Sequence, residues 1–308
     1  MPTNVSRRTT LRWISLAGAA SIFPSYTSVF PDKSMHTRVI PSTTEALPVV
    51  GLGTWQQFDV GTSPSERQPL EEVLKLMIQY GGKLIDSSPM YGKAEKVIGD
   101  LSSGLHLNNT LFYATKVWTS GKEEGIRQME ESMQKMQRET MDLMQIHNLV
   151  DWQTHLQTLK KWKEAGKVRY IGITHYTTAA HDQLEQIIKT ENIDFVQFNY
   201  SIRVRNAEKS LLAAAKDKGV AVIINEPFES GSLFNLVKGK NLPPWAAEYD
   251  IKSWAQYFLK YILSHPAVNC VIPGTSNPKH LTDNMLSGYG AFADEKGRSK
   301  MAAYINSL

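Results

Sequence analysis

The stretch Lys83-Leu-Ile-Asp-Ser-Ser-Pro-Met-Tyr-Gly92 is typical of a short buried strand that ends on a carboxylate. Leu84 and Ile85 supply the apolar strand, Asp86 stands at its carboxyl end, and a Ser-Ser-Pro turn then presents Tyr91. Taken alone, the stretch fits two interpretations equally. Asp86 caps a turn beside a surface aromatic residue, or both side chains belong to a functional site. The ends of the later strands decide between the two.

Short apolar runs recur eight times after residue 48, each suited to one buried strand. Segments between most of them carry apolar residues at helical spacing, as in residues 70–78, and several of these segments end at a glycine. This alternation predicts a closed (β/α)8 barrel, a TIM barrel. An open doubly wound sheet is the alternative, weakened because no Gly-x-Gly-x-x-Gly turn follows any strand. The expected strands are residues 49–54, 83–86, 111–116, 141–147, 170–174, 195–200, 220–225 and 269–273.

Ionisable residues stand where three neighbouring strands of this barrel would end. Asp86 ends the second strand, Lys116 the third and His147 the fourth, and Tyr91 lies in the loop after the second. Each alone has a structural explanation, such as a histidine held by a backbone carbonyl. Because barrel strands bring their carboxyl ends to one rim, four such residues together favour a functional site.

These four side chains suit protonation of a carbonyl oxygen while hydride arrives at its carbon. A phenol with a reference pKa near 10 is a usable acid, and the ammonium of Lys116 is expected to lower the pKa of Tyr91. Asp86 would keep Lys116 charged and oriented, and His147 would donate a hydrogen bond to the substrate oxygen. No protein side chain supplies hydride, so the chemistry requires a nicotinamide cofactor.

Seven motifs occur in the order in which aldo-keto reductases carry them, and residues 45–290 as a whole resemble that family. The motifs are Val49-Val-Gly-Leu-Gly-Thr-Trp55, Leu84-Ile-Asp-Ser-Ser-Pro-Met-Tyr-Gly92, Tyr113-Ala-Thr-Lys-Val-Trp118, Leu143-Met-Gln-Ile-His147, Tyr170-Ile-Gly-Ile-Thr-His175, Val196-Gln-Phe-Asn-Tyr-Ser201 and Val271-Ile-Pro-Gly-Thr-Ser-Asn-Pro278. The resemblance implies a barrel over residues 46–308 that binds NADPH, or less often NADH, and reduces an aldehyde or ketone to an alcohol. It also implies a catalytic tetrad of Asp86, Tyr91, Lys116 and His147.

The resemblance places the cofactor and substrate as well, with some departures from the family pattern. Gln197 fits the glutamine that holds the nicotinamide carboxamide, whereas Asn225 replaces an aromatic residue that usually stacks on the ring. Gly274 replaces a frequent lysine of the adenosine-phosphate loop, which leaves Lys279 as the cation for a 2′-phosphate. The implied cofactor residues are Thr54, Thr174, His175, Gln197, Asn225, Pro227, Phe228, Gly274, Thr275, Lys279 and Asn284, and the implied substrate residues are Trp55, Trp118 and Asn148.

Composition excludes some classes of function. The first 31 residues hold three arginines and no acid, so the 34 basic residues of the chain leave 31 for the remainder, against 30 acidic residues. No basic surface is therefore expected for nucleic acid. The single cysteine, Cys270, lies in an apolar run and is expected to be a buried thiol. It cannot form an intramolecular disulfide or a cysteine-based metal cluster, and no metal site is expected.

The N-terminus is a separate segment. Residues 6–12 read Ser-Arg-Arg-Thr-Thr-Leu-Arg and precede a short uncharged apolar run, so residues 1–31 resemble a twin-arginine export signal. A disordered basic tail is the alternative. The apolar run is too short to span a membrane, and residues 32–45 are expected to form a flexible lead-in. The expected product is a periplasmic monomer that uses the twin-arginine translocase, with a cytoplasmic protein as the alternative.

Two other classes of function fit the same barrel. A sensor or binding subunit could retain a nucleotide as a ligand without turnover, although such a protein has no need of a tuned phenol. A lyase or isomerase could instead use Lys116 to form a Schiff base with a carbonyl substrate.

Overall fold

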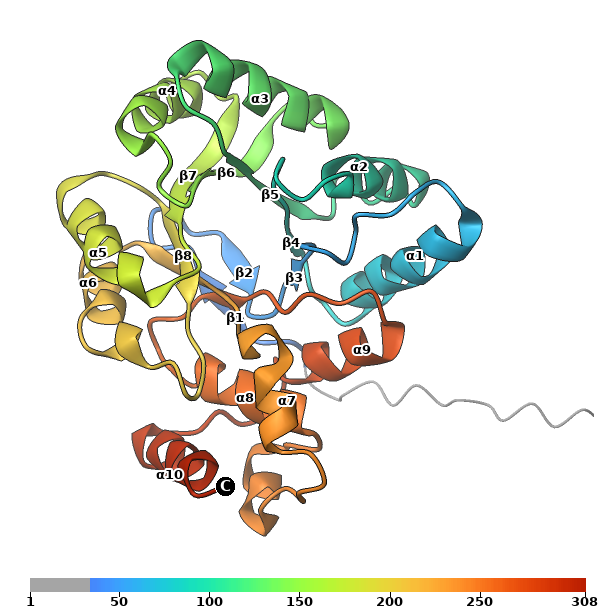
Figure 1. Ribbon diagram of the computed structural model, residues 1–308, viewed down its shortest axis with the longest axis vertical. Helices are drawn as coiled ribbons and strands as arrows, with labels where there is room; N and C mark the ends of the chain where they lie inside the picture. The colour runs from blue at the N-terminus through green and yellow to red at the C-terminus, as the bar shows by residue number, and fades with distance from the viewer. Residues whose placement is uncertain (1–33) are drawn as a thin grey trace, which may run out of the picture. The chain divides into compact units, whose positions relative to one another are not determined.

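The computed structural model describes residues 34–308, which form a barrel of parallel strands surrounded by helices (Figure 1). Each barrel strand pairs with the next strand in the sequence, from β3 through to β10. The strands are β3 (Leu52–Gly53), β4 (Leu84–Asp86), β5 (Phe112–Val117), β6 (Met141–His147), β7 (Val168–Thr174), β8 (Phe195–Asn199), β9 (Ala221–Asn225) and β10 (Cys270–Val271). All eight fall within or beside the segments that the sequence predicted.

The barrel closes where its first and last strands meet. Two parallel bridges, Val50 with Val271 and Gly53 with Gly274, join these strands. The strands approach so closely that a Cβ atom on Gly53 would lie 2.8 Å from the carbonyl oxygen of Ile272, so this position requires glycine. The closure confirms the predicted (β/α)8 barrel and excludes the open doubly wound sheet.

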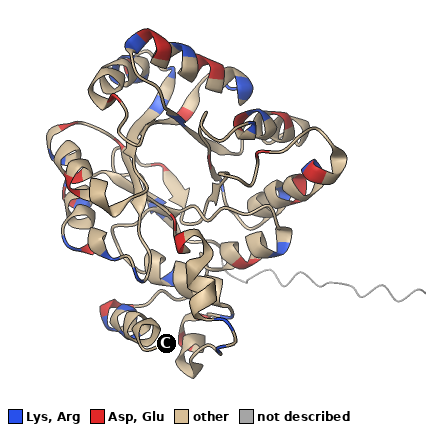
Figure 2. Ribbon diagram, in the orientation of Figure 1, with Lys and Arg blue, Asp and Glu red and all other residues tan. Residues whose placement is uncertain are grey.

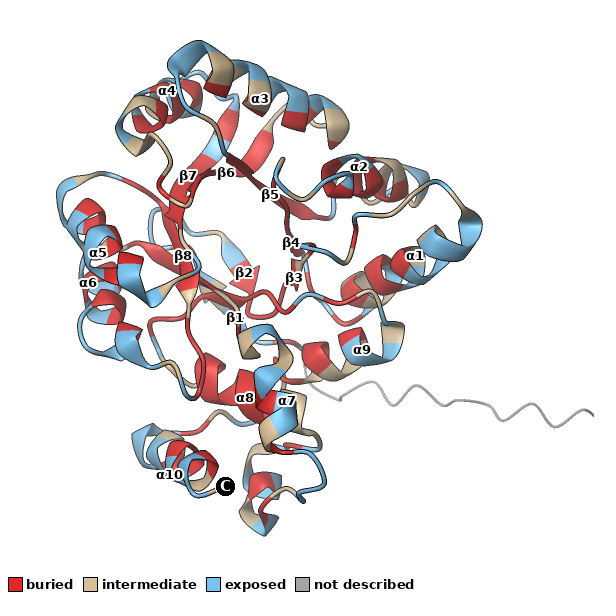
Figure 3. Cartoon of the chain, viewed as in Figure 1, coloured by how far each residue is buried: buried red, intermediate tan, exposed pale blue. Residues whose placement is uncertain are grey.

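Helices cover the outside of the barrel and bury their inner faces against the strands (Figure 3). Gly81, Gly166 and Gly219 follow α1, α4 and α6 and have φ angles of 78°, 72° and 65°. This left-handed conformation ends a helix at low cost in glycine, in agreement with the predicted helix ends. Both signs of charge are spread over the outer helices (Figure 2). The helices are α1 (Pro64–Gln79), α2 (Ala94–Gly104), α3 (Lys122–Lys135), α4 (Trp152–Glu164), α5 (His181–Thr190), α6 (Leu211–Asp217), α7 (Ser232–Leu236), α8 (Trp254–Leu263), α9 (Pro278–Leu286) and α10 (Glu295–Asn306).

A short hairpin of two strands precedes the barrel. Strands β1 (Thr37–Val39) and β2 (Ala46–Pro48) pair antiparallel. Ile40 and Leu47 of this hairpin belong to the same apolar cluster as inward-facing barrel residues such as Phe112 and Cys270, so the hairpin closes one end of the barrel. Cys270 is fully buried, as predicted.

Strand β1 lies in residues 34–45, the described part of the segment that the sequence predicted to be a flexible lead-in. There the guanidinium of Arg38 donates to the carbonyl oxygens of Leu263, His265 and Val268, at and just beyond the carboxyl end of α8. Helix ends leave such carbonyls without partners inside the helix, so the half-buried Arg38 that satisfies them fixes the hairpin in place.

The other N-terminal prediction, the export signal over residues 1–31, lies outside the described residues. Within residues 34–308, no helix combines the length and the apolar composition needed to cross a membrane. No group of His, Cys, Asp and Glu side chains in the same range is placed to hold a metal ion.

Candidate functional site

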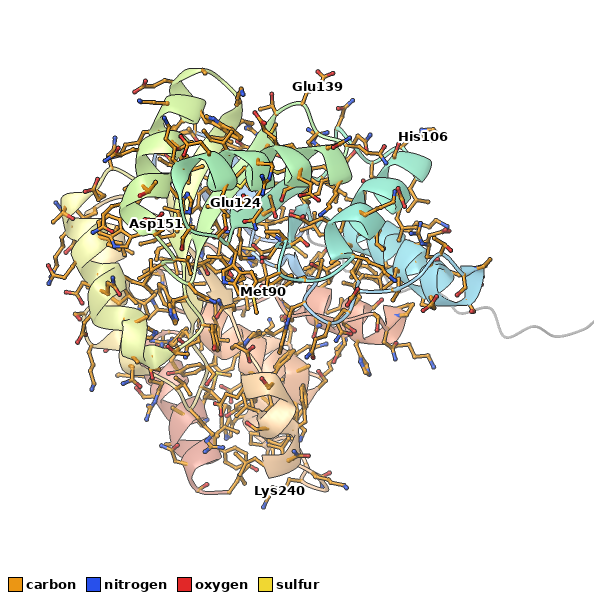
Figure 4. All side chains as sticks on the ribbon, turned by 45° about the horizontal axis from the view of Figure 1, so that its top comes forward. Met90, His106, Glu124, Glu139, Asp151 and Lys240 are labelled. Carbon is orange, nitrogen blue, oxygen red and sulfur yellow. The ribbon has the colours of Figure 1, made fainter. Side chains whose placement is uncertain are left out.

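A cavity of about 980 Å³ lies where the barrel strands end. Its wall includes Tyr91 and the adjacent Met90, whose side chain is labelled in Figure 4. Since the carboxyl ends of parallel barrel strands meet at one rim, residues distant in the sequence converge there. The residues that end or follow a strand and line the cavity include Thr54, Asp86, His147, Thr174, Asn225 and Gly274, and Gln197 of β8 lines it as well.

Lys116 of β5 is fully buried and pairs with Asp86 at the end of β4. Its Nζ donates to Asp86 Oδ2 at 2.5 Å and to the carbonyl oxygen of Ser87 at 2.7 Å. Burial disfavours the ammonium, but the carboxylate of Asp86 and the phenol of Tyr91 outweigh burial and raise the pKa of Lys116. Lys116 therefore stays charged at neutral pH.

Tyr91 lies against both Lys116 and His147. The Nζ of Lys116 is 5.0 Å from the centroid of the Tyr91 ring, and the His147 ring meets it edge-on at 5.8 Å. Burial raises the pKa of Tyr91 and the Lys116 ammonium lowers it, with the net pKa above its ordinary value. The predicted effect of Lys116 has the expected sign, but burial outweighs it, so the expected net lowering of the pKa does not occur. The phenol accordingly keeps its proton at neutral pH.

The His147 imidazole is neutral, and Ser88 sets its tautomer. Burial, together with the charge of Lys116, lowers the pKa of His147 to about 2. Ser88 Oγ lies 2.9 Å from His147 Nδ1 and already accepts a hydrogen bond from the Met90 amide. Ser88 is fully buried, so its hydroxyl hydrogen needs an acceptor inside the protein. Among the described residues, that acceptor is His147 Nδ1. The proton of the imidazole therefore sits on Nε2, where it can be donated.

A chain of amides extends from Asp86 to the far side of the cavity. Asp86 Oδ1 accepts hydrogen bonds from Gln145 Nε2 and Gln197 Nε2, both at 3.0 Å. Because the carboxylate only accepts, Gln197 must turn its Oε1 away from Asp86, and that oxygen accepts from Asn225 Nδ2 at 3.2 Å. With the amides in this orientation, Asn225 Oδ1 is buried without a donor among the described residues. The Asp86 charge thus fixes which way each amide faces.

The expected cofactor residues divide into two groups. Thr54, Thr174, Gln197, Asn225, Pro227, Phe228 and Gly274 line the cavity. Outside its wall lie the others, of which Thr275 and Asn284 are buried, His175 is half-buried and Lys279 is exposed. Asn277 begins α9 by accepting from the amide of Lys279, so the Lys279 side chain stands at the start of that helix. The aromatic ring of Phe228 packs against Phe234, with centroids 4.9 Å apart.

The expected substrate residues line the cavity or lie beside His147. Trp55 and Asn148 line the cavity, whereas Trp118 lies beside His147 with ring centroids 6.4 Å apart. Both tryptophans are partly exposed, at 45% for Trp55 and 41% for Trp118. Asn148 Oδ1 is a second buried acceptor without a donor in the described part of the chain.

Sequence reasoning missed Ser88, Gln145 and Glu226. Ser88 stands in the Ser-Ser-Pro turn after β4, and its position between Asp86 and Tyr91 is the signal that could have identified it. Gln145 precedes His147 by two residues and so points to the same face of β6, which period-two spacing could have shown. Glu226 follows Asn225 and lines the cavity.

The geometry counts against a Schiff-base role for Lys116. A lysine that attacks a carbonyl needs its amine neutral, which requires a lowered pKa. Here the pKa of Lys116 is raised and its Nζ is occupied by Asp86 and the Ser87 carbonyl. Lys116 also lies behind the cavity wall, beyond direct reach of a substrate.

Comparison with known structures supports the fold. An aldo-keto reductase from Klebsiella pneumoniae in complex with NADPH has a TM-score of 0.73 at 22% identity, covering 89% of this chain and 96% of that one. The thermostable aldo-keto reductase Tm1743, in complex with the inhibitor epalrestat, has a TM-score of 0.72 at 23% identity, covering 87% and 99%. At this level of identity the likeness concerns the barrel alone.

Sequence comparison identifies the family. Methylglyoxal reductase YeaE of Escherichia coli (strain K12) is 28% identical over 247 residues, which cover 78% of this chain and 84% of that protein. Glyoxal reductase of Bacillus subtilis (strain 168) is 27% identical over 243 residues, covering 77% and 82%. The model of the aldo/keto reductase family matches residues 49–296. The chain therefore belongs to the aldo/keto reductase family of oxidoreductases.

Proposed function

We propose that the protein reduces an aldehyde or ketone to an alcohol with NADPH, and that Tyr91 donates the proton. The observation that carries this proposal is the convergence of a protonated phenol, a buried ammonium and a neutral imidazole at one cavity. The relatives named methylglyoxal reductase and glyoxal reductase support a small carbonyl substrate. The Klebsiella structure with bound NADPH supports the cofactor.

The residues at the cavity wall fit a nicotinamide cofactor. Two buried acceptors, Asn148 Oδ1 and Asn225 Oδ1, have no donor among the described residues. A carboxamide NH2 group carries two hydrogens and can satisfy such acceptors, which otherwise cost free energy. Gln197 lines the same wall. Lys279, outside the wall at the start of α9, would pair with a 2′-phosphate. When bound, the reduced nicotinamide supplies the hydride that no side chain can.

The protein's own groups position the carbonyl and move one proton. The Nε2–H of His147 donates a hydrogen bond to the carbonyl oxygen and holds it near the Tyr91 hydroxyl. As negative charge develops on that oxygen, the phenol transfers its proton. The adjacent Lys116 ammonium stabilises the phenolate that forms, and Asp86 with its two amide donors keeps Lys116 in place.

A titration tests the proposal directly. NADPH should quench the tryptophan fluorescence of the protein, and the bound cofactor should be oxidised when a small aldehyde such as methylglyoxal is added. Binding without oxidation across a panel of aldehydes and ketones would favour a non-catalytic barrel. Absence of binding to protein stripped of nucleotide would reject the proposal.

Ser88 is expected to act on the reaction through His147. Replacing Ser88 by alanine should lower kcat about tenfold, because the imidazole loses the group that fixes its tautomer. The KM for NADPH should not change, since Ser88 touches the imidazole and not the cavity wall. Ser87→Ala is the matched control, because it removes a hydroxyl from the same turn that bonds Thr54 and not His147. Equal effects of the two variants would contradict the role of Ser88.

The pH dependence of kcat should reflect Tyr91 and not His147. With a pKa of about 2, His147 stays neutral at every pH at which the enzyme is assayed. The acid form of Tyr91 is the active one, so kcat should stay level between about pH 5 and 9 and fall only above about 10. A titration step near 6.5 in the kcat profile of the chemical step would show that His147 takes up a proton.

We propose further that residues 1–31 direct export of the folded monomer by the twin-arginine route, on the sequence pattern alone. This route carries folded proteins, which fits a reductase that binds its cofactor before transport. Replacing Arg7 and Arg8 by lysine should hold the protein in the cytoplasm, as cell fractionation would show. Export of the variant at the unaltered rate would contradict the proposal, and sedimentation would test the monomer.

A further inference from the structure

The cavity is lined by acids without a basic partner on its wall. Asp86, Glu226 and Glu229 contribute carboxylates, and the wall formed by residues 34–308 contains no lysine or arginine. His147 and His175 do not offset this charge, because burial lowers the pKa of both. A carboxylate on the wall that has no basic partner favours a cationic group beside it.

Two of the three carboxylates are already balanced. Asp86 pairs with the buried Lys116. Glu229 accepts from Ser201 Oγ at 2.6 Å and from Ser232 Oγ at 3.3 Å, and lies 4.0 Å from Arg203. These carboxylates therefore have partners inside the protein and need none from a ligand.

Glu226 differs from both. Its Oε2 accepts from the amide of Ser230 at 3.0 Å and from Ser230 Oγ at 2.9 Å, and no cation of the described chain pairs with it. The side chain is half-buried on the cavity wall, and its backbone is held at φ 50°, a conformation that costs about 1 kcal/mol for a residue with a side chain. Glu226 and Tyr91 line the same cavity, and the negative charge of Glu226 adds to burial in raising the pKa of Tyr91.

We propose that Glu226 is the counter-ion for an organic cation that the reaction brings next to the carbonyl. Two groups have this chemistry: a cationic substituent, such as an ammonium, on the substrate, and the ring of the oxidised nicotinamide. The inference rests on the proposed carbonyl reduction. In a partly buried cavity, an unpaired carboxylate attracts a nearby cation more strongly than it does in water.

Glu226→Gln is the variant that tests the charge alone. The carbonyl oxygen of the introduced glutamine can still accept from both Ser230 donors, so the loop keeps its hydrogen bonds. Glu226→Asn is the second variant, because asparagine tolerates a positive φ and guards against a folding defect. Glu229→Gln is the matched control, a carboxylate on the same wall that the protein itself balances.

The first measurement compares kcat/KM for three aldehydes: 4-(trimethylammonio)benzaldehyde, 4-nitrobenzaldehyde and 4-carboxybenzaldehyde. Each ratio of wild type to variant is taken within one aldehyde, which cancels the electronic effect of the substituent. If the cation is on the substrate, Glu226→Gln lowers kcat/KM for the ammonium aldehyde about tenfold relative to the nitro compound, and raises it for the carboxylate.

The second measurement compares the dissociation constants of NADP+ and NADPH by tryptophan fluorescence, without turnover. If the cation is the nicotinamide ring, Glu226→Gln weakens NADP+ about tenfold relative to NADPH. Either shift, absent in Glu229→Gln, supports the proposal and identifies the cation. Unchanged aldehyde and coenzyme ratios in both Glu226 variants would overturn it. Failure of the wild type to reduce the uncharged aldehyde would instead count against the proposed function.

Discussion

Tyr91→Phe is expected to lower kcat for carbonyl reduction about a thousandfold while the dissociation constant for NADPH changes by no more than a few fold. Phenylalanine keeps the ring that packs against His147 and Lys116, so the site retains its shape. It removes the hydroxyl, which is the one group at this position able to give a proton to the carbonyl oxygen. The loss should therefore fall on the chemical step and not on binding.

Single-turnover kinetics would separate an effect on the chemical step from an effect on binding, because they report hydride transfer without product release. Tyr176→Phe is the matched control, since Tyr176 lines the same cavity but is 56% exposed. Loss of the Tyr176 hydroxyl should lower kcat far less than loss of the Tyr91 hydroxyl. If Tyr91→Phe kept more than about a tenth of the wild-type rate, another acid would have to donate the proton.

The barrel could be predicted because its signals are local. Each strand is an apolar run of a few residues, and the glycines that end helices adopt the left-handed conformation they favour. The hairpin of β1 and β2 could not, since Arg38 and Ile40 are fixed by residues that lie far away in the chain. Long-range contacts of this kind leave no periodic pattern in a sequence.

The convergence of Asp86, Tyr91, Lys116 and His147 could likewise be predicted, because a barrel fixes where strand ends meet. The pKa of Tyr91 and the orientations of the amide groups could not be predicted in this way. The sequence suggests that Lys116 lowers the pKa of Tyr91, but only the packed structure shows that burial prevails. The Asp86 carboxylate sets the orientation of the side-chain amides of Gln197 and Asn225. This orientation too depends on the spatial order of three strands.

The largest effect on stability is expected from Lys116→Met. This change leaves the Asp86 carboxylate, which is 2% exposed, without its cation. Breaking one side of a buried ion pair typically costs about 3–5 kcal/mol of unfolding free energy, which urea titration would measure. Activity should also be lost, because the phenolate of Tyr91 would form without an adjacent positive charge.

Adding Asp86→Asn to Lys116→Met separates these two losses. The double variant has no orphaned charge, and the carbonyl oxygen of the introduced asparagine can still accept from Gln145 and Gln197. Its stability should return to within about 2 kcal/mol of wild type, while reduction stays lost. If the double variant were no more stable than Lys116→Met, the orphaned carboxylate would not be the cause of the instability.

The pH dependence of stability gives an independent check on the same cause. In Lys116→Met the Asp86 carboxylate is buried without a cation beside it, and burial disfavours its charged form relative to the neutral acid. The folded protein then binds the proton more tightly than the unfolded chain, so the variant should gain stability as the pH falls from about 8 to 5. The double variant lacks the carboxylate and should not show that added gain. A shared slope in the two variants would place the titrating group elsewhere than at Asp86.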